Sequence, residues 1–238
     1  MGGPNLAGWK LTIPEVSDKG TAASVDDLGR GAPPWMIRDS DGSLRFWAPV
    51  AGATTPNSQH ARTELVSLTT FTAGTARHTL RASVSVGQVP SAKPDVIIGQ
   101  VHGAGNIRSV SFVMLHYDGG TIRAVVKQTQ SGPNSLKYPL ISGVPLGARF
   151  DYAISAIDAN SIVCTATYGS NSRTATIPIP HVFDGATVRF QAGDYQQADS
   201  KAAHSTGSVT KRGGGSKAED GARVTFYSLV EAHNPGRT

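Results

Sequence analysis

Apolar and polar residues alternate along most of the chain, the pattern of strands that bury one face. The same segments are rich in β-branched and aromatic residues, which favour strands. The clearest strands are predicted at residues 43–48, 79–86, 110–117, 121–127, 152–157, 161–167, 188–192 and 223–229. Asp-Gly pairs mark turns between strands, at residues 41–42, 118–119, 184–185 and 220–221. Helical periodicity is scarce, and only residues 25–28 are predicted as a short helical turn.

Length and composition favour one globular domain. The 238 residues are 39% hydrophobic, enough to bury a sizeable core and too many for a disordered polymer. No change of composition and no repeat divides the chain, so residues 1–238 are predicted to form a single all-β domain, an antiparallel β-sandwich. No apolar run is long enough to span a membrane, so none is expected.

The positive charge narrows the partners without choosing among them. Lys and Arg number 22 against 17 Asp and Glu, a net charge of +5, which attracts polyanions. Nucleic acid, an anionic membrane and an acidic polysaccharide all fit that charge. Residues 199–220 are predicted as a long basic loop, either a solvated connection or a flap that contacts substrate. Its cations are Lys201, Lys211, Arg212 and Lys217.

The single cysteine and the first residues bear on the cellular compartment. Cys164 is the only cysteine, which excludes an internal disulfide, and its alternating strand predicts a small buried hydrophobe. The chain starts without the basic stretch and apolar core of a signal peptide. The protein is therefore either cytosolic or secreted with its leader absent from this sequence. We expect the second, and we expect a monomer.

Three predicted strands carry polar side chains on one face and apolar side chains on the other, because successive residues of a strand alternate between its faces. These polar faces hold Arg62 and Glu64 in the first strand, Gln100 and His102 in the second, and Arg189, Gln191, Tyr195 and Gln197 in the third. Taken singly, each has a structural explanation: a surface ion pair, solvent-facing residues or an edge aromatic. Their combination suggests a site.

Together these segments resemble polysaccharide lyase family 7, the jelly-roll alginate lyases. Three motifs match in the family's order: Arg-Thr-Glu-Leu-Val at 62–66, Gln-Val-His at 100–102, and Arg-Phe-Gln-Ala-Gly-Asp-Tyr-Gln-Gln at 189–197. Residues 9–14 and 224–229 resemble the opening and closing strands. The resemblance implies a concanavalin-like jelly roll with a substrate groove on its concave sheet. It also implies β-elimination of 1,4-linked alginate to unsaturated uronate ends, with no cofactor or metal.

The resemblance also implies a role for each residue. Arg62 and Gln100 bind the uronate carboxylate, Glu64 orients Arg62, and His102 is the base with Tyr195 as the acid, or Tyr195 serves as both. Removing the C5 proton places negative charge on the carboxylate, so neutralising that charge is the largest electrostatic task. An imidazole suits the proton abstraction near neutral pH. In mannuronate the proton and the leaving oxygen lie on one side of the ring; in guluronate they lie on opposite sides.

Two positions depart from the family's pattern. Val66 stands where the family has a second arginine, and Gln191 stands where it has a lysine. The chain offers other cations to compensate, and the predicted substrate-binding set is therefore Glu64, Arg123, Lys127, Arg189, Gln191 and Gln197, with the basic loop beside them.

The same departures leave the polymer open. The Gln-Val-His form favours mannuronate-rich alginate, and glucuronan or another polyuronate is the alternative. A jelly roll that binds carbohydrate without cleaving it is a further alternative, because a fold does not fix a function. Nucleic-acid binding rests on charge alone, and we do not expect it.

Overall fold

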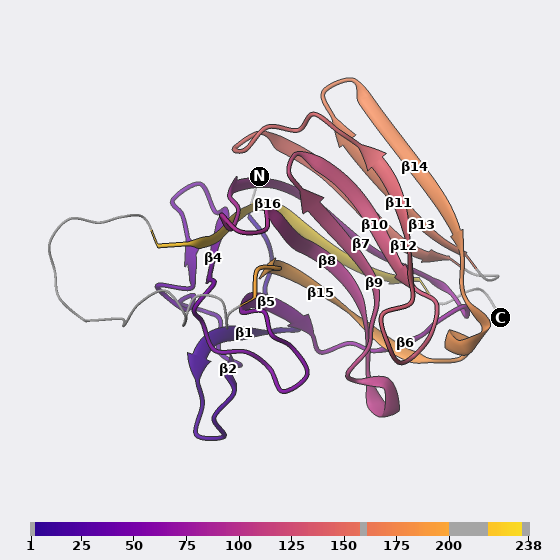
Figure 1. Ribbon diagram of the computed structural model, residues 1–238, viewed down its shortest axis with the longest axis horizontal. Helices are drawn as coiled ribbons and strands as arrows, with labels where there is room; N and C mark the ends of the chain where they lie inside the picture. The colour runs from indigo at the N-terminus through magenta and orange to yellow at the C-terminus, as the bar shows by residue number, and fades with distance from the viewer. Residues whose placement is uncertain (1–2, 158–160, 200–218, 235–238) are drawn as a thin grey trace, which may run out of the picture.

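The computed structural model describes residues 3–157, 161–199 and 219–234. Within these residues, sixteen strands form two sheets that pack face to face, and two short 3-10 helices lie in the connections between strands (Figure 1). All strand pairs between the named strands are antiparallel, which confirms the predicted antiparallel β-sandwich. Most of the predicted basic loop, residues 200–218, lies outside the described residues.

The first sheet brings together strands that are far apart in sequence. Its order is β11 (Ser135–Ile141), β10 (Thr121–Lys127), β9 (Ser111–Asp118), β8 (Asp95–Gly103), β15 (Thr187–Gln196), β5 (Arg62–Ser67), β1 (Trp9–Val16) and β2 (Ala22–Val25), with β6 (Phe71–Thr72) beside β15. The three segments with polar faces are β5, β8 and β15. They are adjacent, with β15 in the middle, so the fold gathers all three motifs at one place (Figure 1).

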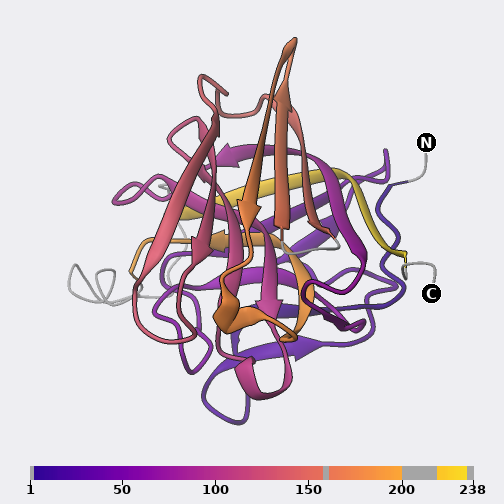
Figure 2. The same ribbon diagram turned by 90° about the vertical axis from the view of Figure 1, so that its right-hand side faces the viewer.

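The second sheet covers the inner face of the first. Its order is β14 (Asn171–Pro178), β13 (Ser161–Tyr168), β12 (Arg149–Ile157), β7 (Arg77–Gln88), β16 (Gly221–Asn234), β4 (Leu44–Pro49) and β3 (Met36–Arg38). The 3-10 helices are η1 (Gly105–Ile107), after β8, and η2 (His181–Phe183), before β15. Figure 2 shows β1 and β2, in indigo, and the end of the β13–β14 hairpin, in salmon to orange, at opposite ends of the molecule.

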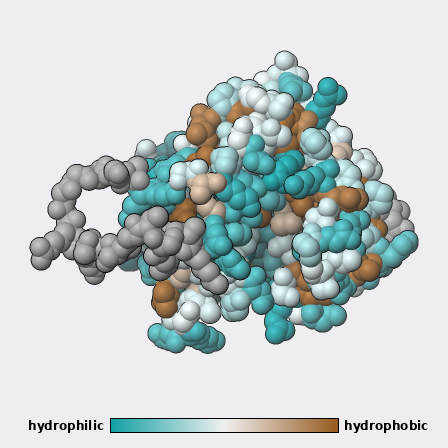
Figure 3. Space-filling view, viewed as in Figure 1, coloured by the Kyte–Doolittle hydropathy of each residue, from teal (hydrophilic) through white to brown (hydrophobic). Residues whose placement is uncertain are grey.

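The core lies between the sheets and decides which face of each strand points outward. Fully buried apolar side chains enter it from both sheets, among them Leu11, Leu65, Val101, Phe190, Phe46, Val84 and Phe226. Burying each large apolar side chain contributes about 1.5–3 kcal/mol, so a strand cannot turn over without a large loss. Cys164 is fully buried, as predicted, and burial raises the pKa of its thiol to about 12. On the face shown in Figure 3, the hydrophobic patches are small and scattered.

Two glycines allow close approaches on the strands with polar faces. A Cβ on Gly99 would lie 2.7 Å from the hydroxyl oxygen of Tyr152, which reaches across from β12 and donates to the Ile98 carbonyl at 2.9 Å. A Cβ on Gly193 would lie 2.5 Å from the Thr63 carbonyl oxygen. Glycine at position 193 therefore lets β15 pair closely with β5, between Gln191 and Tyr195.

Some elements differ from the predictions. Residues 25–28 form no helical turn; Val25 ends β2, and the segment after it is irregular. Strands β11 and β14 were not predicted, because they are edge strands whose side chains are largely exposed and show no clear apolar alternation. Among the described residues, no helix has the length and apolar character needed to cross a membrane.

Candidate active site

A cleft with a volume of about 360 Å³ lies on the outer face of the first sheet. Six of the residues predicted from the motifs line it: Arg62, Glu64, His102, Arg189, Gln191 and Tyr195. Strand register explains why they meet. On β15, Tyr195 pairs with Arg62 of β5, while Arg189 pairs with His102 of β8. The predicted shared face of the three strands is therefore observed for these six side chains.

Arg62 lies at one end of this cluster with its charge held over Tyr195. Its guanidinium carbon is 3.5 Å from the centroid of the Tyr195 ring. Nη1 donates to Glu64 Oε2 at 3.2 Å, and Nη2 reaches Thr55 Oγ1 at 3.5 Å. Only 8% of Arg62 is exposed, and its buried Nε has no partner. The guanidinium is thus fixed at the cleft wall and retains hydrogen-bonding capacity.

Glu64, Gln100 and Gln191 form a hydrogen-bonded group in the floor. The Gln100 amide nitrogen donates to Glu64 Oε1 and, at 3.3 Å, to Gln191 Oε1. Burial raises the pKa of the Glu64 carboxyl, while the Arg62 charge and the Gln100 hydrogen bond oppose that rise. Gln100 is fully buried and lies beneath the cleft surface, with its own Oε1 unpaired. Glu64 therefore accepts hydrogen bonds from both Arg62, which it was predicted to orient, and Gln100.

His102 presents a neutral imidazole to the cleft. Its Nδ1 lies 3.0 Å from the Gly103 carbonyl oxygen, which can only accept, so Nδ1 carries the proton and Nε2 keeps its lone pair. Burial lowers the pKa of His102 to about 4, an effect that the charges of Arg62 and Arg189 reinforce and the Gly103 hydrogen bond opposes. At neutral pH His102 is therefore an unprotonated base.

Tyr195 is fixed by its ring and by its hydroxyl. Arg62 covers one ring face, and the Tyr195 hydroxyl is 2.9 Å from Ser58 Oγ. Ser58 also contacts the His60 carbonyl and amide, so the hydroxyl of Tyr195 is connected to the turn before β5. Sequence reasoning missed Ser58 and Thr55, because residues 53–61 form an irregular loop with no periodicity to reveal which side chains point inward.

Three predicted substrate-binding residues lie away from the cleft wall. Arg123 is paired with Asp95 at 2.7 Å and with Asp118 at 3.1 Å. The Lys127 ammonium donates to the Gly132 carbonyl. The Gln197 amide turns back to the carbonyls of Tyr195 and Gln196. Their substrate contacts stay predictions, and in this structure other groups occupy their donors.

Two cations that the sequence analysis did not select line the cleft. They are Lys10, on β1, and Arg108, which follows η1. Lys10 had a signal, since it alternates with Trp9 and Leu11, which both enter the core. That alternation places Lys10 outward, but only the pairing of β1 with β5 places it beside the motif residues.

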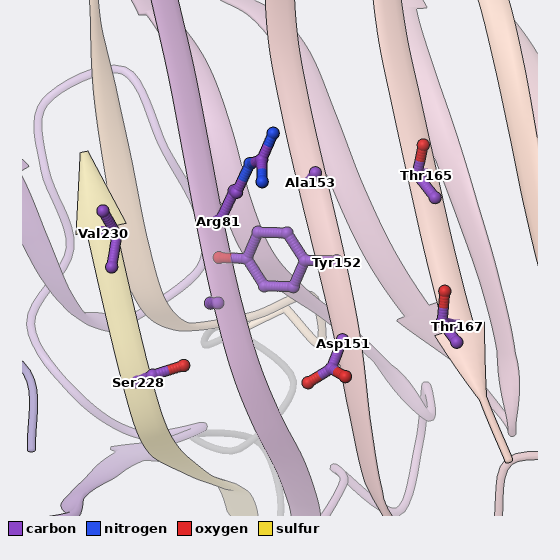
Figure 4. Close-up of a pocket in the computed structure, with 9 residues that line it drawn as sticks. Arg81, Asp151, Tyr152, Ala153, Thr165, Thr167, Ser228 and Val230 are labelled. Carbon is purple, nitrogen blue, oxygen red and sulfur yellow. The ribbon is translucent and has the colours of Figure 1, made fainter. Parts of the chain in front are cut away.

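A larger hollow, of about 450 Å³, lies on the outer face of the second sheet (Figure 4). Figure 4 shows Arg81 and Asp151 on neighbouring strands, with the hydroxyls of Thr165, Thr167 and Ser228 around them. No histidine lines it, and the hydroxyl of its tyrosine, Tyr152, is bound to the Ile98 carbonyl inside the core. The described residues of the hollow thus present no imidazole and no phenol hydroxyl, whereas the cleft on the first sheet has both, so that cleft is the candidate active site.

Within the described part of the chain, no three His, Cys, Asp or Glu side chains are grouped so as to hold a metal ion.

Comparison with known proteins identifies the family. A family model described as alginate lyase matches residues 5–233. The chain belongs to the alginate lyase family. It is therefore a polysaccharide lyase of family 7, as the three motifs indicated. A search of curated proteins finds no match.

Solved structures of alginate lyases share the fold. The alginate lyase PA1167 from Pseudomonas aeruginosa is 26% identical, with a TM-score of 0.76, and the alignment covers 97% of this chain and 100% of that one. The alginate lyase from Klebsiella pneumoniae is 22% identical with a TM-score of 0.77, covering 98% and 97%. The alginate lyase A1-II′, in complex with a product, is 23% identical with a TM-score of 0.74, covering 97% of each chain. The predicted jelly-roll fold is confirmed.

Proposed function

We propose that this lyase cleaves a 1,4-linked polyuronate by β-elimination, with mannuronate-rich alginate as its preferred polymer. One observation carries the proposal: a fixed guanidinium, a neutral imidazole and a phenol, from three neighbouring strands, line one cleft. These are the groups that abstraction of a C5 proton needs. The relatives named above are alginate lyases, one of them in complex with a product, and they support an acidic polysaccharide as substrate.

Carboxylate neutralisation falls to Arg62 in this scheme. When the C5 proton leaves, charge moves onto the carboxylate oxygens, and a positive group already in place stabilises it without rearrangement. Arg62 meets that requirement because Glu64 and the Tyr195 ring fix its position. Gln100 contributes only after its amide turns from Glu64 towards the substrate. Glu64 affects the strength of this interaction. An ionised Glu64 neutralises part of the Arg62 charge, whereas a protonated Glu64 leaves that charge available to the substrate carboxylate.

Proton transfer falls to Tyr195 and His102. For mannuronate, the Tyr195 hydroxyl gives its own proton to the leaving 4-oxygen while its oxygen takes the C5 proton from the same side, so the phenol is regenerated. The C5–H and C4–O bonds break, a C4–C5 double bond forms, and the glycosidic oxygen leaves as a hydroxyl. For guluronate, His102 Nε2 takes the C5 proton from the opposite side, and Tyr195 protonates the leaving oxygen. The open lone pair of His102 suits this step.

The direct test uses three pure polymers: polymannuronate, polyguluronate and glucuronan. The double bond formed by elimination absorbs in the ultraviolet, so cleavage is followed as rising absorbance. We expect the fastest rise with polymannuronate. A faster rise with glucuronan would reassign the polymer and keep the reaction, whereas tight binding of any polymer without product would indicate a binding module.

A further inference from the structure

Lys10 lies in a row of residues that crosses the cleft floor. On β1 it pairs with Val66 of β5, Val66 pairs with Gln191 of β15, and Gln191 pairs with Gln100 of β8. Cα atoms of such antiparallel partners are about 4.5–5.5 Å apart, so Lys10 stands one strand from Val66. Lys10, Val66 and Gln191 all line the cleft. The middle of this row is neutral, and the charge sits at its β1 end.

The orientation of Lys10 is set by its neighbours on β1. Trp9 is 5% exposed and Leu11 is fully buried, both in the core, so the side chain between them must point to the outer face. Lys10 itself is half-buried. Within the described residues, no hydrogen bond or ion pair engages its ammonium group. Its three donors are therefore free, in contrast to those of Arg62.

Two other cations, Arg189 and Arg108, line the cleft in different places. Arg189 of β15 is the register partner of His102 on β8, and Arg108 follows η1, after the end of β8. Both lie on the β8 and β15 side, whereas Lys10 lies beyond β5, on the β1 side. A polyuronate carries one carboxylate on every sugar, so a chain that crosses the cleft brings a carboxylate to each side. Arg62 serves the sugar that is cleaved, and the β1 side needs a cation of its own.

We propose that Lys10 binds the carboxylate of a uronate unit adjacent to the unit that is cleaved. This inference rests on the proposed function, because it requires a polyuronate in the cleft. Lys10 is a substrate-binding residue that contributes equally to ground state and transition state, since it contacts a sugar that does not react. Its cation takes effect in the row where Val66 and Gln191 provide none.

The test begins with Lys10→Met, which keeps the apolar stem and removes the charge. A charge-assisted hydrogen bond that is lost should raise KM for polymannuronate about tenfold at low ionic strength. Because the contact is uniform, kcat should stay within about twofold. The KM of the variant should also depend less on salt than that of the parent enzyme. Arg173→Met is the matched control, since Arg173 is an exposed cation on β14, in the other sheet.

A rescue experiment separates a placed cation from general charge. Adding Val66→Lys to Lys10→Met places an ammonium group one strand closer to the cleft centre. The KM of this double variant should return most of the way to the parent value. Lys10→Arg should behave like the parent. A KM for Lys10→Met within twofold of the parent, or an equal rise in Arg173→Met, would overturn the assignment. Equal thermal unfolding midpoints of the variants would show that β1 is intact.

Calorimetric binding of polymannuronate tests Lys10 separately from catalysis. If the parent protein binds the polymer without cleaving it, the lyase proposal fails, and a tenfold weaker Kd in Lys10→Met still supports the contact. If the parent cleaves polymannuronate but Lys10→Met binds it as tightly as the parent, the Lys10 proposal fails alone. If the parent neither binds nor cleaves any polyuronate, both proposals fall.

Discussion

Arg62 and Arg123 lie on the outer face of the same sheet, in one row across its strands, but they have different ion-pair partners and only Arg62 lines the cleft. The row runs from Arg62 through Tyr195, Ile97 and His116 to Arg123. Arg62 meets one carboxylate and covers the Tyr195 ring at the cleft wall. Arg123 is held by Asp95 and Asp118, and Asp95 also accepts from His116 Nδ1 at 2.7 Å. Each cluster therefore contains an arginine, a carboxylate and an aromatic side chain with a polar atom, which is Tyr195 beside Arg62 and His116 beside Arg123.

The two histidines show what separates a site from a structural cluster. Burial lowers the pKa of both His102 and His116. His102 uses Nδ1 on a neutral carbonyl and lines the cleft. His116 uses Nδ1 on a carboxylate, and its Nε2 is buried without a partner. Residue types alone therefore do not identify an active site; what matters is whether the charge and the lone pair face a cleft.

The largest expected effect is that of Tyr195→Phe. Removal of the phenol takes away the acid for the leaving oxygen, so kcat should fall at least about a thousandfold. Kd for polymannuronate should change less than about threefold, because the ring under Arg62 remains. Tyr138→Phe, on β11, is the control and should keep full turnover. An active Tyr195→Phe enzyme would refute the acid assignment.

The next test replaces each of the two arginines, Arg62 and Arg123, with methionine in separate variants. Arg62→Met should lower kcat/KM about a hundredfold or more, since the carboxylate loses its fixed counter-charge. Arg123→Met should change kcat/KM little and lower the free energy of unfolding by about 2 kcal/mol, because the buried Asp95 carboxylate loses one charged partner and keeps the hydrogen bond from His116. Denaturant titration and initial rates measure both. A large activity loss in a stable Arg123→Met protein would instead place Arg123 in substrate binding, as the sequence suggested.

The pH profile then separates the histidines. Protonation of His102 removes the base, so kcat/KM for polyguluronate should fall only as the pH drops towards about 4, the lowered pKa of His102. His102→Gln should remove that limb together with most guluronate activity, while His116→Gln should keep it. A limb at the ordinary histidine pKa near 6.5 would contradict the burial argument. The lowered pKa of folded His102 also has a consequence for stability. The free energy of unfolding should decrease as the pH falls from about 6.5, the ordinary histidine pKa, to about 4, the pKa of His102 in the folded state.

The smallest effect concerns Asp194, directly before Tyr195. Its side chain is fully buried, and burial raises its pKa well above the ordinary value, while the Ala48 backbone amide and the charge of Arg223 oppose that rise. A raised pKa in the folded state favours folding at low pH, and this contribution is lost as the pH rises. Asp194→Asn should therefore raise the thermal midpoint more at pH 9 than at pH 5. An equal change at both values would show that the carboxyl is not protonated on folding.

Some of the site was accessible from the sequence because strands have a period of two. Alternation placed Arg62, His102, Gln191 and Tyr195 on outward faces without any knowledge of the sheet order. The same argument selected Arg123 but did not reveal its pairing with Asp95 and Asp118, because alternation gives a face and not the neighbours on that face. It also left Ser58 unnoticed, since loops lack periodicity. Secretion, a monomeric state and the role of the basic loop stay predictions.

The sequence by itself determined the all-β class and the faces of the strands, because local alternation and turn residues encode them. Its three motifs indicated the alginate lyase family by resemblance. Only the tertiary structure decided which faces share a cleft. The pairing of β5, β15 and β8 joins residues more than 90 positions apart, as between Gln100 and Gln191. It also set Lys10 beside Val66 and paired Arg123 with Asp95. Long-range register and burial, which fix these partners and shift their pKa values, exist only once the sheets have packed.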